Sequence, residues 1–131
     1  MKKWLKNQKG FTLVELLAVI VILGVIAAIA VPSIGNVISG AREDSAYQSA
    51  LMIRDAADRY LMDNPPADVV TTVAVADLVT GGYLRETPVN PNSTSDPQAS
   101  FTTVNITVSS GSWTIDSVED ADGTVITFAA L

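Results

Sequence analysis

The sequence predicts an α+β protein in which one long N-terminal helix carries a small antiparallel sheet. Residues 16–41 contain 26 consecutive positions without a charge, almost all of them apolar or small. A stripe of apolar residues at helical spacing then continues to about residue 63, and apolar residues alternate with polar ones within residues 100–131. The length of 131 residues allows one domain and an anchor.

The uncharged run is long enough to cross a membrane, since about 20 apolar residues span a bilayer. Lys2, Lys3, Lys6 and Lys9 precede it, and they are the only lysines in the chain. By the positive-inside rule, this distribution places the N-terminus in the cytoplasm and the C-terminal part outside.

Glu15 stands at the start of the apolar run. A carboxylate at the edge of hydrocarbon costs at least about 2 kcal/mol unless it has a partner. No cation occurs between residues 10 and 41, so we expect the partner to come from elsewhere.

The segment Lys9-Gly10-Phe11-Thr12-Leu13-Val14-Glu15 resembles the class III signal of type IV pilins and pseudopilins. The resemblance implies that residues 1–10 are a basic leader. A membrane-embedded prepilin peptidase would cleave between Gly10 and Phe11, and Phe11 would then be N-methylated. The resemblance also implies that Glu15 pairs with the Phe11 amine of a neighbouring subunit during assembly.

This resemblance implies a structural subunit of a type IV pilus or pilus-like filament and not an enzyme. The expected partners are further copies of the chain, the prepilin peptidase, and an assembly platform with its ATPase. The precursor would cross the inner or cytoplasmic membrane once, and the filament would lie at the cell surface or in the periplasm. Two alternatives are a pseudopilin of a type II secretion or competence system and a monomeric, membrane-anchored binding or adhesin module.

Gly24 and Pro32 are the weak points of the long helix, because glycine and proline disfavour helix interiors. In relatives, the segment between such positions loses helical structure on assembly. An ordinary proline kink is the alternative interpretation.

Two other interpretations of the N-terminus are a general secretory signal, with Ala28-Ile29-Ala30 as its cleavage site, and an uncleaved signal anchor. Neither explains why an acid occupies position 15.

We expect residues 11–40 to form a transmembrane or filament-core helix and residues 41–131 to form a globular head. The head would contain a helix (41–63), a connector (64–99) and three antiparallel strands (100–131). Within the connector, residues 75–80 predict a short helix, and Gly82-Tyr83-Leu84 followed by Pro88-Val89-Asn90-Pro91 is a second feature similar to pseudopilins and Gram-positive pilins.

The helical stripe predicted to face the sheet contains Ala46, Ala50, Ile53, Ala57 and Tyr60. On the other faces, the i,i+4 spacing predicts ion pairs of Arg54 with Asp58 and of Asp55 with Arg59. Turns are expected at 109–112 and 120–123. We expect the aromatic residues Phe101, Trp113 and Phe128 to belong to the core or the strand faces.

Composition excludes several function classes. The chain has no histidine and no cysteine, which removes two common catalytic bases and two common zinc ligands. Without residues 1–10, four arginines stand against 14 acids, a net charge of −10, so direct nucleic-acid binding is not expected. The absence of lysine beyond the leader also argues against a sortase-linked pilus.

We expect no cofactor, with calcium as the minor alternative. Some secretion pseudopilins bind calcium in their C-terminal region, and Asp116, Asp120 and Asp122 are the candidate ligands here. A solvated turn is the preferred interpretation, because the spacing does not complete an EF-hand loop.

Overall fold

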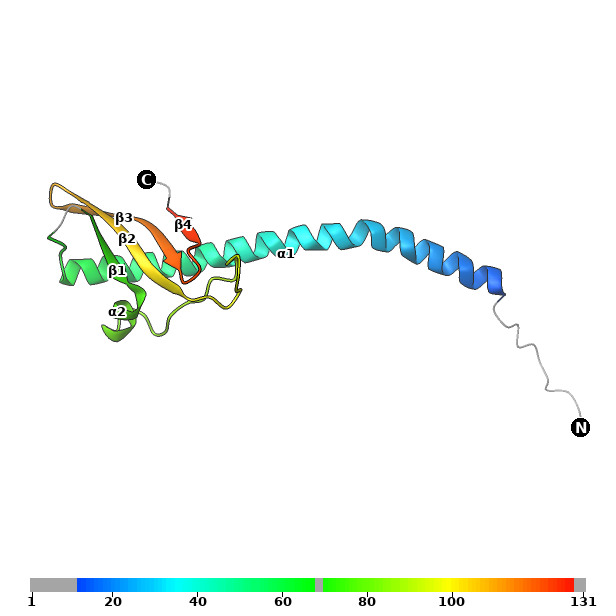
Figure 1. Cartoon of the computed structure of the whole chain (residues 1–131), viewed down its shortest axis with the longest axis horizontal. Coiled ribbons are helices and arrows are strands. Elements are labelled where there is room, and N and C mark those ends of the chain that lie inside the picture. Colours follow the sequence, from blue (N-terminus) through cyan, green and yellow to red (C-terminus); the bar gives the residue numbers. More distant parts are fainter. Residues whose placement is uncertain (1–11, 68–69, 129–131) are drawn as a thin grey trace, which may run out of the picture. The chain divides into compact units, whose positions relative to one another are not determined.

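The computed structural model describes residues 12–67 and 70–128 (Figure 1). Helix α1 (Leu13–Asp63) runs without interruption through Gly24 and Pro32. The chain divides into two compact units, one ending at Ile38 and the other beginning at Ser39, so α1 contributes to both. The helix ends one residue before Asn64-Pro65-Pro66, as expected for residues that precede proline.

The second unit confirms the α+β fold class. After α1 follow β1 (Val70–Ala74), α2 (Val75–Thr80), β2 (Phe101–Ser109), β3 (Ser112–Asp120) and β4 (Val125–Thr127). The strands form one antiparallel sheet in the order β1-β2-β3-β4. The predicted short helix at 75–80 is confirmed.

The three strands predicted within residues 100–131 are confirmed as β2, β3 and β4, but the sheet has a fourth strand that was not predicted. Strand β1 lies inside the segment that was predicted to be a connector, and its Val73 pairs with Val104 of β2. The residues of β1 are rich in β-branched side chains, which favour strands. However, β1 is only five residues long and leads directly into α2, so its sequence pattern is short. Its strand conformation depends on pairing with β2, which follows about 30 residues later in the chain.

Two irregularities in the pairing of β2 with β3 decide which side chains enter the core. One lies between Phe101 and Thr103, and the other between Asn105 and Ile106. The first one puts Phe101 inside and leaves Thr102 exposed, whereas strict alternation from the buried Val104 would give the reverse. Both predicted turns are confirmed: Gly111 adopts a φ of 80° and Gly123 a φ of 82°, a region that glycine occupies without strain.

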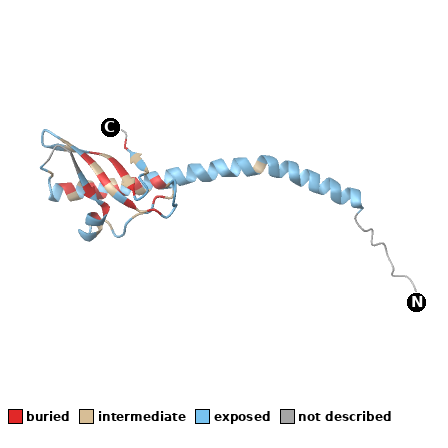
Figure 2. Cartoon of the chain, viewed as in Figure 1, coloured by how far each residue is buried: buried red, intermediate tan, exposed pale blue. Residues whose placement is uncertain are grey.

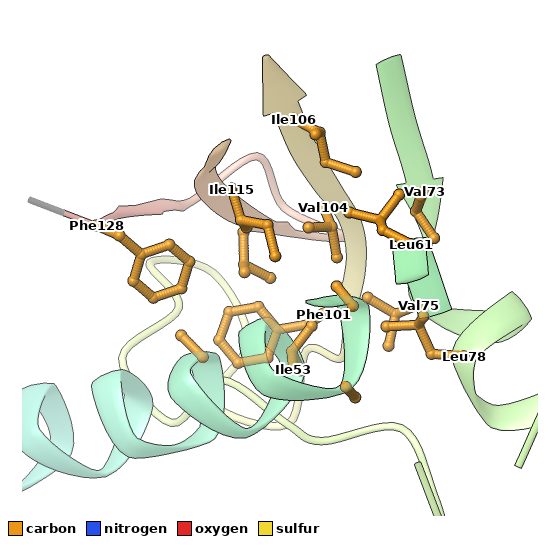
Figure 3. Close-up of a cluster of buried hydrophobic side chains, with 14 residues drawn as sticks. Ile53, Leu61, Val73, Val75, Leu78, Phe101, Val104, Ile106, Ile115 and Phe128 are labelled. Atoms are coloured by element: carbon orange, nitrogen blue, oxygen red, sulfur yellow. The ribbon is translucent and has the colours of Figure 1, made fainter. Parts of the chain in front are cut away.

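The core lies between the second half of α1 and one face of the sheet, with α2 at its side (Figure 3). The predicted stripe of α1 is confirmed, except that Tyr60 is only partly buried, and Ala56 and Leu61 join it. Phe101 points from β2 towards α1, where Ile53 is fully buried. Phe101 and Phe128 are core residues as expected, whereas Trp113 is half-buried and donates its indole N–H to Asp58.

The Gly-Tyr-Leu motif packs the connector against the end of α1. The Tyr83 ring stands edge-on to Tyr60, and its hydroxyl donates to Asp63 at 2.5 Å. Glycine at position 81 leaves room for this ring, because a Cβ there would lie 2.8 Å from it. The motif therefore holds the tyrosine against the last two turns of the helix.

The two ion pairs predicted on α1 are not formed within the described part of the chain. Arg54 instead lies over the Phe128 ring, 5.4 Å from its centroid. Arg59 reaches the carbonyl oxygen of Tyr83, and Asp58 accepts the Trp113 indole hydrogen bond. Surface ion pairs contribute little in water, so contacts with the sheet and the connector prevail over pairing along the helix.

Candidate assembly site at the start of the apolar helix

Thr12 and Glu15 form a capping box at the first turn of α1. The backbone N–H of Thr12 donates to Glu15 Oε2 at 2.9 Å, and the Thr12 hydroxyl donates to the same oxygen at 3.2 Å. In return, the N–H of Glu15 donates to Thr12 Oγ1 at 3.2 Å. The N–H of Leu16 bonds to the Thr12 carbonyl at 3.2 Å, which makes Thr12 the N-cap of the helix. The arrangement satisfies backbone donors that the helix itself leaves unpaired.

The cap gives Glu15 a partner that the sequence analysis did not identify. A threonine followed three residues later by a glutamate, just before an apolar run, is the sequence signature of this motif. The signature is present at positions 12 and 15 and could have been recognised. Glu15 also lies where the helix dipole favours a negative charge, which adds roughly 0.3–1 kcal/mol at an exposed site.

Beyond this turn, the first half of α1 is exposed along almost its whole length (Figure 2). Sixteen large aliphatic residues between Leu13 and Ile38 are 49–81 % exposed. This helix is long and apolar enough to cross a membrane, although a signal sequence near the N-terminus meets the same criteria. Full burial of such a side chain stabilises by roughly 1.5–3 kcal/mol, so this half of the helix requires an apolar environment that the described residues do not supply.

The predicted leader, 1–10, and the predicted cleavage and methylation residues Gly10 and Phe11 lie outside the described residues. Gly24 and Pro32 lie within continuous α1, and a Cβ at Gly24 would meet nothing within 4 Å. The structure therefore describes Glu15 with its local partner Thr12 and not with an amine.

The three calcium candidates do not converge. Asp116 accepts a hydrogen bond from the Thr107 hydroxyl at 2.6 Å. Asp120 bonds to Asn90 and Asp122 bonds to Ser93, each on the neighbouring loop. Within 12–67 and 70–128, no three acidic side chains form a group that could hold a metal ion.

Comparison with known proteins gives matches to one family. Residues 5–31 match the family described as the prokaryotic N-terminal methylation motif. Type II secretion system core protein G of Pseudomonas aeruginosa is 34% identical over 98 residues, which cover 66% of this chain and 69% of the relative. Core protein G of Vibrio cholerae is 32% identical over 103 residues, which cover 70% of this chain and 69% of the relative.

Pilus proteins match over shorter segments. The type IV major fimbrial protein FimA of Dichelobacter nodosus is 39% identical over 61 residues, covering 47% of this chain and 38% of the relative. No solved structure gives a significant match.

The chain belongs to the type IV pilin and pseudopilin family. The resemblance of residues 9–15 to a class III signal is supported by the family match over residues 5–31, and the relatives extend the similarity to about two thirds of the chain. Glu15 lies within the matched methylation motif, and so does Thr12, its hydrogen-bond partner in the capping box.

Proposed function

We propose that this chain is the structural subunit of a type IV pilus or pilus-like filament, made as a membrane-anchored precursor. Cleavage between Gly10 and Phe11 and methylation of Phe11 would precede polymerisation through the N-terminal helix. The observation that carries the proposal is the exposed apolar half of α1, headed by a single capped carboxylate.

The first step of the argument concerns the apolar surface. A helix that is apolar all round is stable in lipid or inside a bundle, not in water. Lipid covers this surface in the precursor, and the same surface on neighbouring subunits covers it in the filament. The helices therefore exchange lipid contacts for contacts with each other, with the extraction driven by a cytoplasmic ATPase and its membrane platform.

The second step concerns the charge of Glu15. A carboxylate offers about four lone-pair sites, and hydrogen bonds from Thr12 use only part of this capacity. The new α-amine at Phe11 is the cation that the apolar segment lacks. Pairing of this amine with Glu15 of a neighbouring subunit would neutralise both charges and set the axial register of the filament.

A second candidate is a pseudopilin of a type II secretion or competence system. It is favoured by the share of the relative that the match covers, which is 69% for core protein G of Pseudomonas aeruginosa but 38% for FimA, 55% for the fimbrial protein EcpC of Eikenella corrodens and 51% for the type IV major pilin PilE of Neisseria gonorrhoeae. Both candidates use the same assembly site. A monomeric adhesin remains the alternative from another class, and it would leave the apolar helix in lipid permanently.

The decisive experiment is the isolation of filaments from the native host by shearing, followed by mass spectrometry. We expect the chain in the filament fraction, beginning at Phe11 and carrying one additional methyl group. Because all lysines lie in residues 1–10, the α-amine of Phe11 is the only amine in the processed chain. An amine-reactive reagent should therefore label the detergent-solubilised subunit once and the intact filament much less.

Gly10→Leu provides the matched control for processing. This variant should accumulate as unprocessed precursor in the membrane fraction and should not enter filaments. Efficient processing of Gly10→Leu, or a mature chain beginning at Val31, would contradict the assigned cleavage site. Absence of the wild-type chain from every filament fraction, with processed protein present in the membrane, would favour the monomeric adhesin.

A further inference from the structure

Two loops of the head are joined through a buried carboxylate. Asn90, in the connector, is fully buried, and Asp120, at the end of β3, is 2 % exposed. The Asn90 side-chain amide donates to Asp120 Oδ2 at 2.8 Å. The other oxygen, Oδ1, accepts the backbone N–H groups of Asp122 at 3.0 Å and Thr124 at 2.8 Å. Both oxygens of Asp120 therefore have protein donors.

A second joint lies beside the first. Asp122 Oδ2 accepts the Ser93 hydroxyl at 2.6 Å and the backbone N–H of Asp96 at 3.1 Å. The hydrogen bond from Ser93 is the main reason why the pKa of Asp122 is lowered from its usual value. The backbone adds a further link, since the N–H of Ala121 donates to the carbonyl of Ser100 at 3.1 Å.

Asn90 organises its own loop as well. Its side-chain oxygen accepts the N–H of Asn92 at 3.0 Å, and its backbone N–H donates to the carbonyl of Ala99 at 2.7 Å. No buried side-chain nitrogen or oxygen in the described part of the chain lacks a hydrogen-bond partner. A fully satisfied buried polar network specifies one arrangement, because breaking any member leaves its partner desolvated and unpaired.

The family implies calcium in this region for some secretion pseudopilins, and the residues here do not fit that ion. Calcium takes six to eight oxygen ligands, including several carboxylates. Three N–H groups donate to Asp120, so this buried carboxylate has about one of its four lone-pair sites left for a cation. Among the described residues, no three acidic side chains lie together as a calcium site would require. Asp116, the third candidate, bonds to Thr107 instead.

We propose that Asn90–Asp120 and Ser93–Asp122 form a metal-independent latch between the connector and the β3–β4 turn. Hydrogen-bond donors of the chain itself join these two loops, so the joint needs no bound cation. The head should therefore fold to the same stability in a chelator. This proposal concerns the head alone and holds whether the chain forms a pilus, a secretion pseudopilus or neither.

The test uses the full chain in detergent micelles with Trp4 replaced by phenylalanine. Trp113 is then the only tryptophan, and its half-buried indole, bonded to Asp58, reports unfolding of the head whether or not the leader is removed. Tm is measured in excess EDTA and in several millimolar CaCl2, above the roughly 10⁻⁴–10⁻³ M Kd of extracellular calcium modules. MgCl2 at the same concentration controls for general screening of the acidic head.

We expect the same Tm in EDTA, CaCl2 and MgCl2. A calcium site occupied at about ten times its Kd would raise the Tm of a domain of this size by roughly 5–10 °C. A rise of that kind in CaCl2 alone would overturn the proposal.

Variants test the latch itself in EDTA. Asp120→Asn loses the carboxylate that accepts three N–H bonds, so we expect its Tm to fall by about 5–10 °C. Asp116→Asn is the matched control, since it removes the same charge from a position outside the latch and should change Tm by about 2 °C or less. Equal Tm values for Asp120→Asn and Asp116→Asn would show that the latch does not hold the head.

Should Asp120→Asn fail to fold, Ser93→Ala gives the graded test. It removes one partner of the exposed Asp122 and should lower Tm by a few degrees in EDTA and in CaCl2 alike. A Ser93→Ala head that is destabilised in EDTA but restored by CaCl2 would mean that these carboxylates hold a cation, which contradicts the proposal.

Discussion

The two halves of α1 have the same backbone conformation and opposite relations to their surroundings. Before Ser39, the large aliphatic side chains are 49–81 % exposed. After it, the helix buries Ala46, Ala50, Ile53, Ala56, Ala57 and Leu61 to 1% exposure or less. The second half finds its apolar partner in the sheet of its own chain, and the first half does not.

The periodicity of apolar residues in a helix thus indicates where its apolar partner comes from. An amphipathic stripe requires one packed face, which a small sheet can supply. An apolar surface on all sides requires partners all round, and lipid or several identical helices can supply them. The one charged residue of the first half, Glu15, lies at its N-terminal end.

The largest expected effect is that of replacing Glu15 in the first half of α1. We expect Glu15→Val to insert and to be processed, because an apolar side chain inserts more readily than a carboxylate. Filament yield should fall at least about tenfold, since every subunit would bury an amine without its partner. The measurement is the filament yield after shearing, with the processed protein in the membrane fraction as the control.

Glu15→Gln separates the cap from the charge. Glutamine can accept hydrogen bonds from Thr12 as the third residue of a capping box, but it cannot neutralise an amine. Filament loss similar to that of Glu15→Val would show that charge pairing dominates. Wild-type yield from Glu15→Gln would show that the cap alone suffices and would contradict the proposed pairing.

A matched pair of isoleucines tests the two halves directly. Ile53→Ala should destabilise the head by about 2–5 kcal/mol, because this fully buried side chain would leave a cavity under the sheet. Ile22, which is 58% exposed, should leave the Tm of the head unchanged when replaced by alanine. Thermal unfolding in micelles, followed by Trp113 fluorescence, measures both. Equal losses would mean that the two halves of the helix unfold as one unit.

A smaller effect on the stability of the head is expected when Gly81, but not Gly24, is replaced by alanine. Gly81→Ala should destabilise the head by about 1–2 kcal/mol, because the new methyl group would collide with the Tyr83 ring unless the connector moves. At Gly24, the space around the Cβ position is open, so Gly24→Ala should not lower the Tm of the head. Chemical denaturation distinguishes these outcomes, and an unaffected Gly81→Ala head would show that the Gly-Tyr-Leu motif tolerates movement.

The smallest expected effect concerns pH. Donation of a hydrogen bond to Asp63 raises the pKa of Tyr83 above its usual 10.0, so folding favours the protonated phenol. This contribution to stability is complete below pH 10 and is lost as the pH rises beyond it. Tyr83→Phe should therefore have a slightly lower Tm than wild type near neutral pH, and the difference should vanish in alkaline buffer. A constant difference at all pH values would assign the effect to packing.

Local patterns in the sequence were sufficient for the elements whose cause is local. The helix end before Pro65, the short helix at 75–80 and the turns containing Gly111 and Gly123 depend on nearest neighbours and were predicted. The capping box of Thr12 and Glu15 is equally local, and its signature was present but not used.

Other features depend on residues far apart in the chain. Strand β1 depends on its pairing with β2, and the inward position of Phe101 depends on an irregularity in the pairing with β3. Arg54 and Asp58 could pair along the helix, yet each contacts an aromatic residue brought there by the sheet.

The order of residues along the chain was enough to predict an apolar helix with one acid at its start, followed by an α+β head. Charge order and apolar length are properties of the chain alone, and a membrane responds to them before the head has folded. The burial of Asp120 against Asn90, 30 residues away in the sequence, could be seen only in the folded structure. The reason is physical: whether a carboxylate meets a cation, water or an amide depends on which loop folds against it, and that contact is formed only when the sheet closes on the helix.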